Sequence, residues 1–218
     1  MRLLLFFTIC VFSISIGRSQ ISVNAGTGFM KGFSNPKYFY GLHLGGEIPR
    51  SNELTLYARV GYYFPQREDD SSSTFLTAND FNTIPYQILT NYVSTLSHLT
   101  IEGGTRYYIG NGYDNGFSGY GGNCLMIMNS TVKRKYDYYD RSKYSIPEGE
   151  EDAGSILSIL LGLQGGIKYT EPVIGTFYFD VSGAYSLLSL PSNQTAANTT
   201  LFSPLIFNFS VGFRKDFY

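Results

Sequence analysis

The sequence lacks tryptophan and has few charged residues. Only 15 % of its 218 residues are Asp, Glu, Lys or Arg, and Tyr and Phe supply the whole aromatic share of 17 %. The formal net charge is −1, so there is no basic excess of the kind that binds nucleic acid, and we expect no nucleic-acid partner. Tyr and Phe favour strands, and the 24 glycines suit turns and bulges, so the composition predicts a β-rich protein.

Cysteine is scarce, and long apolar runs are confined to the start of the chain. Residues 1–19 have a positive start at Arg2, an apolar run over 3–16 and small residues at 17–19, which is typical of a signal peptide. The run is shorter than the ~20 residues that a spanning helix needs. We expect cleavage after Ser19, which removes Cys10 and leaves one domain over 20–218. Cys124 then has no cysteine to pair with, so an internal disulfide is excluded.

The mature chain alternates apolar and polar residues with a period of two. Seven clear segments cover 21–29, 38–48, 54–64, 98–109, 157–169, 177–187 and 205–214. An eighth strand is expected over 117–130, with Tyr120, Cys124, Met126 and Met128 on the apolar face and with Asn123 and Asn129 opposite. Short connections (49–52, 111–116, 170–175) alternate with longer ones (31–37, 65–95, 132–153, 191–203). This pattern predicts an all-β, eight-stranded, antiparallel up-and-down barrel.

Alternation alone does not tell which face of the barrel is wet, because soluble and membrane barrels share it. On the seven clear strands, every charged residue lies on the polar face: Glu47, Arg59, Glu102, Arg106, Lys168, Asp180 and Arg214. That face is otherwise rich in glycine and small hydroxyls, which suits a narrow interior better than a solvated surface. We therefore expect a transmembrane barrel with these seven charges in its lumen and with Leu, Val, Ile and Phe facing lipid.

The end of the chain carries a resemblance. Apolar residues alternate through Phe207, Phe209, Val211 and Phe213, and Phe217 follows in the same register. With the eight strands, this pattern resembles the small outer-membrane β-barrel proteins of the OmpA/OmpX/OmpW-like and PorT-like type. The resemblance implies an outer-membrane location in a Gram-negative-type envelope, with outer-membrane lipids around the barrel. It also implies an assembly signal for the barrel-assembly machinery.

The residues of that signal would be Phe209, Val211, Phe213 and Phe217. Two residues depart from the family's pattern, since Lys215 interrupts the apolar row and Tyr218 follows the expected terminal aromatic.

Three roles are open to the interior charges: bracing the barrel, lining a path for solutes, and catalysis. Desolvated charges need partners, so we expect Lys168 with Asp180, and Arg59 with Glu102, as pairs that brace the barrel. The same charges could line a narrow path for solutes. Catalysis would need His98 to meet Thr100 or Glu102, but residues two apart along a strand sit ~7 Å apart.

We expect a non-enzymatic role in the envelope: structural, adhesive, or in an assembly with an envelope or extracellular protein. Loops 65–95 and 132–153 would lie outside, the second one rich in tyrosine. The alternatives are a narrow porin, a lipid- or peptide-processing enzyme, and a secreted lipocalin-like carrier. No motif predicts a cofactor, and the acidic run near Glu148 lacks the spacing of a calcium-binding loop.

Overall fold

The computed structural model describes residues 21–217, except 36, 68–71, 194–195 and 197–201. The expected signal peptide and Tyr218 lie outside the described residues. Within them, the chain forms ten strands: β1 (Ile21–Gly32), β2 (Tyr38–Pro49), β3 (Leu54–Arg67), β4 (Ser72–Ala78), β5 (Gln87–Gly110), β6 (Gly116–Tyr136), β7 (Tyr144–Ser145), β8 (Ala153–Glu171), β9 (Gly175–Pro191) and β10 (Leu205–Phe217).

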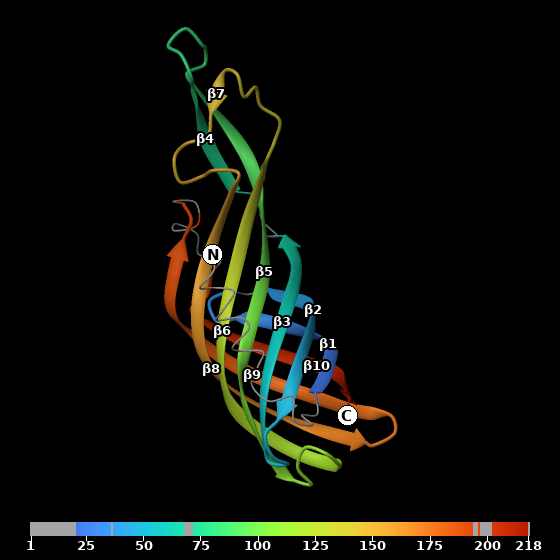
Figure 1. Cartoon of the computed structure of the whole chain (residues 1–218). Coiled ribbons are helices and arrows are strands. Elements are labelled where there is room, and N and C mark those ends of the chain that lie inside the picture. Colours follow the sequence, from blue (N-terminus) through green and yellow to red (C-terminus); the bar gives the residue numbers. More distant parts are fainter. Residues whose placement is uncertain (1–20, 36, 68–71, 194–195, 197–201, 218) are drawn as a thin grey trace, which may run out of the picture.

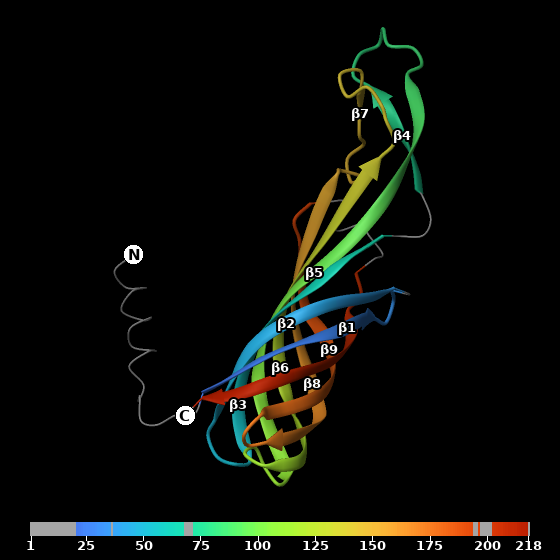
Figure 2. The same cartoon turned by 90° about the vertical axis from the view of Figure 1, so that its right-hand side faces the viewer.

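Eight of these strands close into a barrel. The order runs β3, β2, β1, β10, β9, β8, β6 and β5, and pairing of β3 with β5 closes the ring. Every pairing is antiparallel. Within the ring each strand pairs with the next ring strand in sequence, and the first and last strands, β1 and β10, pair with each other, while β4 and β7 lie outside the ring (Figures 1 and 2). The predicted eight-stranded up-and-down barrel is therefore confirmed. No helix in the described part of the chain is long and apolar enough to cross a membrane.

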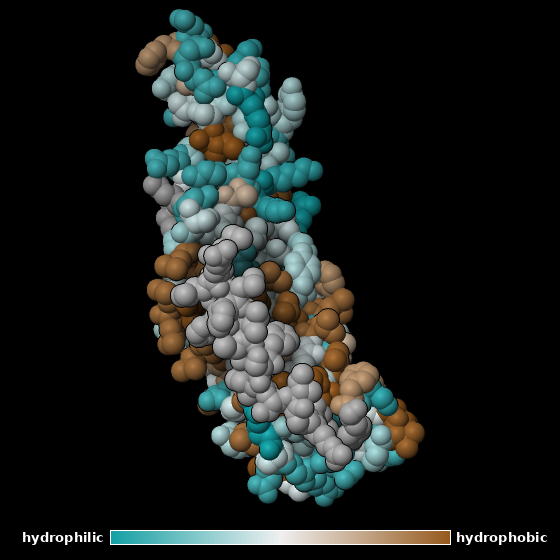
Figure 3. Space-filling view, viewed as in Figure 1, coloured by the Kyte–Doolittle hydropathy of each residue, from teal (hydrophilic) through white to brown (hydrophobic). Residues whose placement is uncertain are grey.

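The barrel is apolar outside and polar inside. Leu44 is 60 % exposed and Leu163 is 73 % exposed, whereas Arg59 and Glu102 are 5 % and 4 % exposed. In the space-filling view, hydrophobic residues gather over the barrel, and the part above it is mostly hydrophilic (Figure 3). A closed ring of hydrogen-bonded strands with an apolar exterior is the β-structure that lipid allows. The barrel thus spans a membrane.

Strand β6 faces the opposite way from the prediction. Tyr120, Cys124, Met126 and Met128 are buried in the lumen, and Leu125 and Ile127 face outward. Both faces of this strand are apolar here, so hydropathy could not set its phase. Asn123 points outward, where Thr105 of β5 donates a hydrogen bond to its amide oxygen at 2.6 Å.

The strands also extend well beyond the barrel on one side. β5 has 24 residues and β6 has 21, about twice the ~9–11 that span a bilayer. Much of the expected loop 65–95 is therefore strand, since it contains β4 and the start of β5. The expected loop 132–153 likewise contains the end of β6 and the short β7.

We call this extension the head and define it as residues 72–92 and 134–152. β4 pairs with β5 and with β7, and Leu76, Ala78 and Tyr144 form a small core (Figure 2). Residues 87–92 of the head are the outer end of β5.

Candidate functional site

The centre of the lumen holds an unbroken chain of alternating charges, which we call the lumen charge chain. Its order is Glu102, Arg59, Asp180, Arg106, Glu47, Arg214 and Asp216. Six of these residues are at most 5 % exposed, and the seventh, Asp216, is partly buried. Every acid in the chain touches an arginine and every arginine touches two acids, which is how charges tolerate removal from water.

The contacts near Asp180 are charge-assisted and specific. Arg59 donates to Glu102 at 2.7 Å and to Asp180 at 3.1 Å, and Arg106 donates to Asp180 at 3.0 Å. Tyr120 donates its hydroxyl hydrogen to the other carboxylate oxygen of Asp180. The planar guanidinium can serve two acids at once, which the point charge of a lysine does less well. Asp180 therefore joins β3, β5, β6 and β9 across the lumen.

Glu47 is the second junction. Arg106 donates to it at 3.0 Å, and the hydroxyls of Thr55 and Tyr108 donate to its other oxygen at 2.5 and 2.6 Å. Arg214 lies 3.7 Å from the same carboxylate. Glu47 is fully buried, so these donors replace its lost water.

The sequence-derived pairing of Lys168 with Asp180 is wrong. Lys168 is diagonal to Asp180 in the β8–β9 register, but its ammonium donates to the carbonyls of Tyr113 and Asn115 at 2.9 and 3.2 Å. The two arginines already satisfy Asp180, and carbonyls of a nearby turn are within reach of the lysine. The predicted neighbours Arg59 and Glu102 do lie together, directly opposite each other on β3 and β5.

The turn between β5 and β6 folds back and closes one end of the lumen. Tyr113 is 1 % exposed, and its hydroxyl bonds to Ser22 and Asp216 at 2.9 and 3.0 Å. The guanidinium of Arg214 stacks on the Tyr113 ring at 3.7 Å. This plug was not predicted, because 111–116 was read only as a tight turn. Asp216 was missed too, although the alternation that places Arg214 inside also places Asp216 inside.

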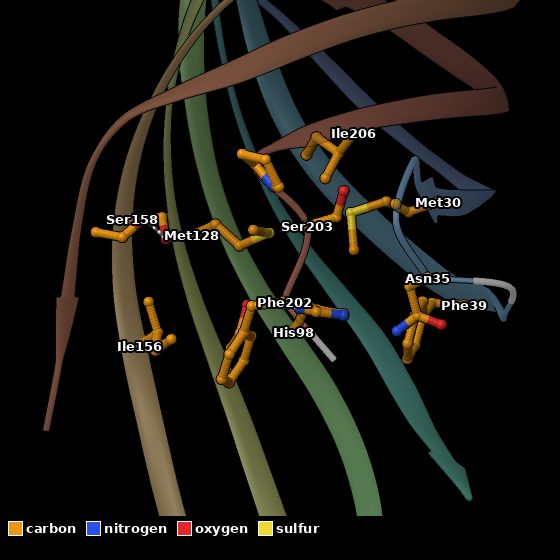
Figure 4. A pocket seen from close by; sticks show the side chains of 14 residues that line it. Met30, Asn35, Phe39, His98, Met128, Ile156, Ser158, Phe202, Ser203 and Ile206 are labelled. Atoms are coloured by element: carbon orange, nitrogen blue, oxygen red, sulfur yellow. Dashed lines mark hydrogen bonds between the residues drawn. The ribbon is translucent and has the colours of Figure 1, made fainter. Parts of the chain in front are cut away.

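The other end of the lumen, below the head, is apolar. A cavity of about 160 Å³ lies there, and Met30, Phe39, Met128, Phe202 and Ile206 are among the residues that line it (Figure 4). Met128, one of the β6 residues that face the lumen against the prediction, lines this cavity.

His98 lies in the wall of this cavity. Its Nδ1 is 2.7 Å from the Ser130 hydroxyl, and Phe39 packs edge-on against its ring at 4.5 Å. Glu102, four residues from His98 on β5, accepts a hydrogen bond from Arg59 and none from His98. In the part of the chain that the structure describes, no carboxylate orients His98, so its contacts give a serine–histidine pair without the third member of a triad. His43 is also interior, 2.7 Å from the Tyr178 hydroxyl.

The head is ordered by its own contacts. Tyr144 donates to the Pro85 carbonyl at 2.9 Å, and Tyr136 donates to the Glu150 carbonyl. Burial raises the pKa of Tyr136 to about 12, so the phenol remains a donor. In the turn between β4 and β5, Phe81 and Ile84 are 92 % and 91 % exposed, and Tyr138, in the segment after β6, is 100 % exposed.

The last strand shows the predicted alternation. Val211 and Phe217 face outward, Phe209 stacks on Phe29 at 5.0 Å, and Phe213 packs against Phe177 at 5.1 Å. The departure at Lys215 has a local partner, since its ammonium donates to the Val173 and Ile174 carbonyls at 3.0 and 3.1 Å. Whether assembly factors read this row stays a prediction.

Comparison with known proteins supports the fold. No family model matches the sequence, and neither does any curated protein. Among solved structures, Neisserial surface protein A is similar over 91 % of this chain and 97 % of its own, at 12 % identity and a TM-score of 0.50. A major outer membrane protein from Thermus thermophilus is similar over 92 % and 100 %, at 14 % identity and a TM-score of 0.50.

The chain thus has the fold of small outer-membrane β-barrel proteins, as its sequence pattern predicted. With its lipid-facing exterior, it is an integral protein of an outer membrane.

Proposed function

We propose that this protein is a non-conducting outer-membrane barrel that presents its head as a binding surface for an extracellular protein. The observation that carries the proposal is the contrast between the two ends of the long strands. The centre of the barrel interior is filled with paired side chains, whereas the head is a folded extension that carries exposed aromatic residues. A rigid sheet that lifts such residues away from the bilayer suits contact with another molecule.

The chemistry of these exposed residues favours a protein partner. Phe81 stacks on Tyr86 with ring centroids 6.2 Å apart, so part of this apolar surface is held in place before any contact. Exposed Phe, Ile and Tyr side chains are the kind that act as anchors in protein interfaces. Tyr138, which is fully exposed, adds an amphipathic ring from the 134–152 segment.

The surrounding lipids are the second partner in this proposal. On the outer face, Leu99 of β5 pairs with Tyr62 of β3. Four residues before Leu99, on the side toward the head, the same face becomes polar at Thr95. Arg67 and Lys133 flank Thr95 there, and Lys135 follows on β6. This cationic row, at the upper edge of the apolar belt, suits the phosphate groups of outer-leaflet lipids. The barrel-assembly machinery remains a proposed partner through β10.

The proposal of a non-enzymatic role is supported by the contacts of His98 in the wall of the upper cavity. His98 bonds to Ser130, but no acid supports it among the described residues, and the nearest predicted acid, Glu102, is neutralised by Arg59. The filled centre of the lumen supports a barrel that does not transport solutes, because a solute would have to displace buried charge pairs.

The test is adhesion of cells that display the protein. The triple variant Phe81→Ser, Ile84→Ser, Tyr138→Ser removes three exposed side chains of the head without touching its core. We expect at least a tenfold drop in retention of these cells on protein-coated surfaces, with surface display unchanged on immunofluorescence. The matched control changes two exposed polar residues of the head, Ser72→Ala and Ser73→Ala, and should retain cells as the wild type does. Equal retention by all three would contradict the proposal.

A further inference from the structure

The cavity at the upper end of the lumen is lined only by uncharged residues. Its apolar wall comes from Met30, Phe39, Met128, Ile156, Phe202 and Ile206, and its polar groups from Asn35, His98, Ser130, Ser158, Ser189 and Ser203. This is a sharp change from the next level of the lumen, where the lumen charge chain begins at Glu102, four residues from His98 on β5. A ligand here would meet aliphatic and aromatic carbon, hydroxyls and an imidazole, but no formal charge from the lining.

The polar groups are arranged in pairs on the cavity wall. His98 and Ser130 are 2.7 Å apart on β5 and β6, and Ser158 and Ser189 are 3.1 Å apart on β8 and β9. A hydroxyl both donates and accepts, so either pair can bind one more neutral group. Figure 4 shows Met30, Met128 and His98 projecting toward the same space from different strands.

Among the described residues, the pairing of β9 with β10 ends beside this cavity. β9 pairs with β10 only as far as Tyr185 opposite Leu205, and one more hydrogen bond joins Ser186 to the Pro204 carbonyl at 2.7 Å. Beyond that point β9 continues to pair with β8, as far as Pro191, and no other described strand pairs with it. The seam between β9 and β10 therefore ends at the height of the cavity, next to Pro204 and Ser189 in its lining.

We propose that this cavity binds one small neutral molecule, or the short apolar tail of an amphipathic one, with a hydroxyl, carbonyl or amide group held by the polar pairs. Its volume, about 160 Å³, is close to that of engineered protein cavities that take a benzene ring. A short alkyl chain or a single ring fits this space, and a cationic or anionic group is excluded by the cost of losing water without a charged partner. This site lies beyond the binding role proposed for the head.

The methionines offer a direct readout. Met30 and Met128 line the cavity, whereas Met126 lies two residues from Met128 on the same strand and outside the lining. In nanodiscs, with the methionine methyl groups ¹³C-labelled, titration with 1-hexanol should shift the Met30 and Met128 signals saturably and move Met126 much less. Hexylammonium and hexanoate have the same tail with a charge, and we expect at least tenfold weaker binding of both.

Two variants of β8 separate the cavity from the lipid. Ser158→Phe places a ring in the cavity and should abolish the saturable shifts, whereas Leu161→Phe adds the same ring on the lipid-facing side, where Leu161 is 52 % exposed, and should leave them unchanged. Shifts that never saturate, that persist in a folded Ser158→Phe barrel, or that are equal for hexanol and hexylammonium would overturn the proposal. Should Ser158→Phe fail to fold, the comparison of the three probes on the wild type still decides.

Discussion

At the scale of single residues, the lumen is organised by its acids. Asp180 and Glu47 each receive donors from more than one strand, and each accepts from a tyrosine as well as from arginine. Without these acids each arginine of the lumen would be an unpaired buried ion, which costs several kcal/mol. The acids therefore determine which side chains can occupy the barrel centre.

This argument predicts the effect of Asp180→Asn. The amide keeps the shape but loses the charge, and Arg59 and Arg106 are then left as like charges around a neutral group. We expect the free energy of unfolding to fall by ~3–5 kcal/mol, the range for breaking a buried pair. Urea titration in lipid vesicles, with the heat-shifted band on a gel as the measure of folded barrel, gives this value.

The control for that change is Glu53→Gln, which neutralises an exposed carboxylate in the turn before β3. Exposed charges contribute ~0–1 kcal/mol, so its unfolding curve should overlay that of the wild type. If the two variants unfold at the same urea concentration, the lumen charge chain does not stabilise the barrel.

At the scale of strands, the sequence predicts most of the architecture, because a membrane barrel obeys one simple rule. Residues such as Leu42 and Arg59 each have one suitable side, lipid or lumen, so alternation fixes the strand and its facing together. The rule fails on β6, where Met126 and Ile127 suit either side. Only the packing of the apolar upper lumen against Met30 and Phe39 decides that strand.

Contacts between residues that are far apart in the sequence and meet across the lumen could not be predicted either. Nothing local indicates that Tyr113 enters the barrel, or that Lys168 binds turn carbonyls rather than Asp180. The head was missed as structure because 65–95 has no clear alternation along most of its length. Its strands are defined by pairing with the outer end of β5.

The close approach of β5 and β6 gives a prediction for the strands. A Cβ added to Gly122 would lie 1.8 Å from the Thr105 carbonyl oxygen, whereas one added to Gly119 of the same strand would have no atom nearer than 3.9 Å. Gly122→Ala must push the β5 backbone aside, and we expect a loss of ~1–3 kcal/mol, as for overpacking. Gly119→Ala should change stability by less than ~1 kcal/mol. The same urea titration compares them, and equal losses would refute the steric account.

At the scale of the whole molecule, the lumen is electrically balanced. The lumen charge chain has four acids and three arginines, and Lys168 supplies the remaining positive charge. A balanced, paired interior has no excess of one sign to attract ions. Together with the Tyr113 plug at the end opposite the head, this balance supports the proposal that the barrel is a rigid support rather than a conduit.

The last prediction is therefore electrical silence. Purified protein in a planar bilayer with concentrated KCl, chosen to enlarge any current, should give no discrete conductance steps, while a large-pore porin in the same bilayer does. An eight-stranded barrel has an interior just wide enough for side chains to fill, and here paired charges fill it.

Replacing residues 68–91 by a short Gly-Ser turn removes β4 and its hairpin but leaves the β3–β5 pairing, which ends at Arg67 and Thr95. This shortened barrel should be silent too, because the seal lies in the lumen. Steps that appear only after this deletion would show instead that the β4–β5 hairpin closes a conducting barrel, and steps in the wild type would support the narrow-porin alternative.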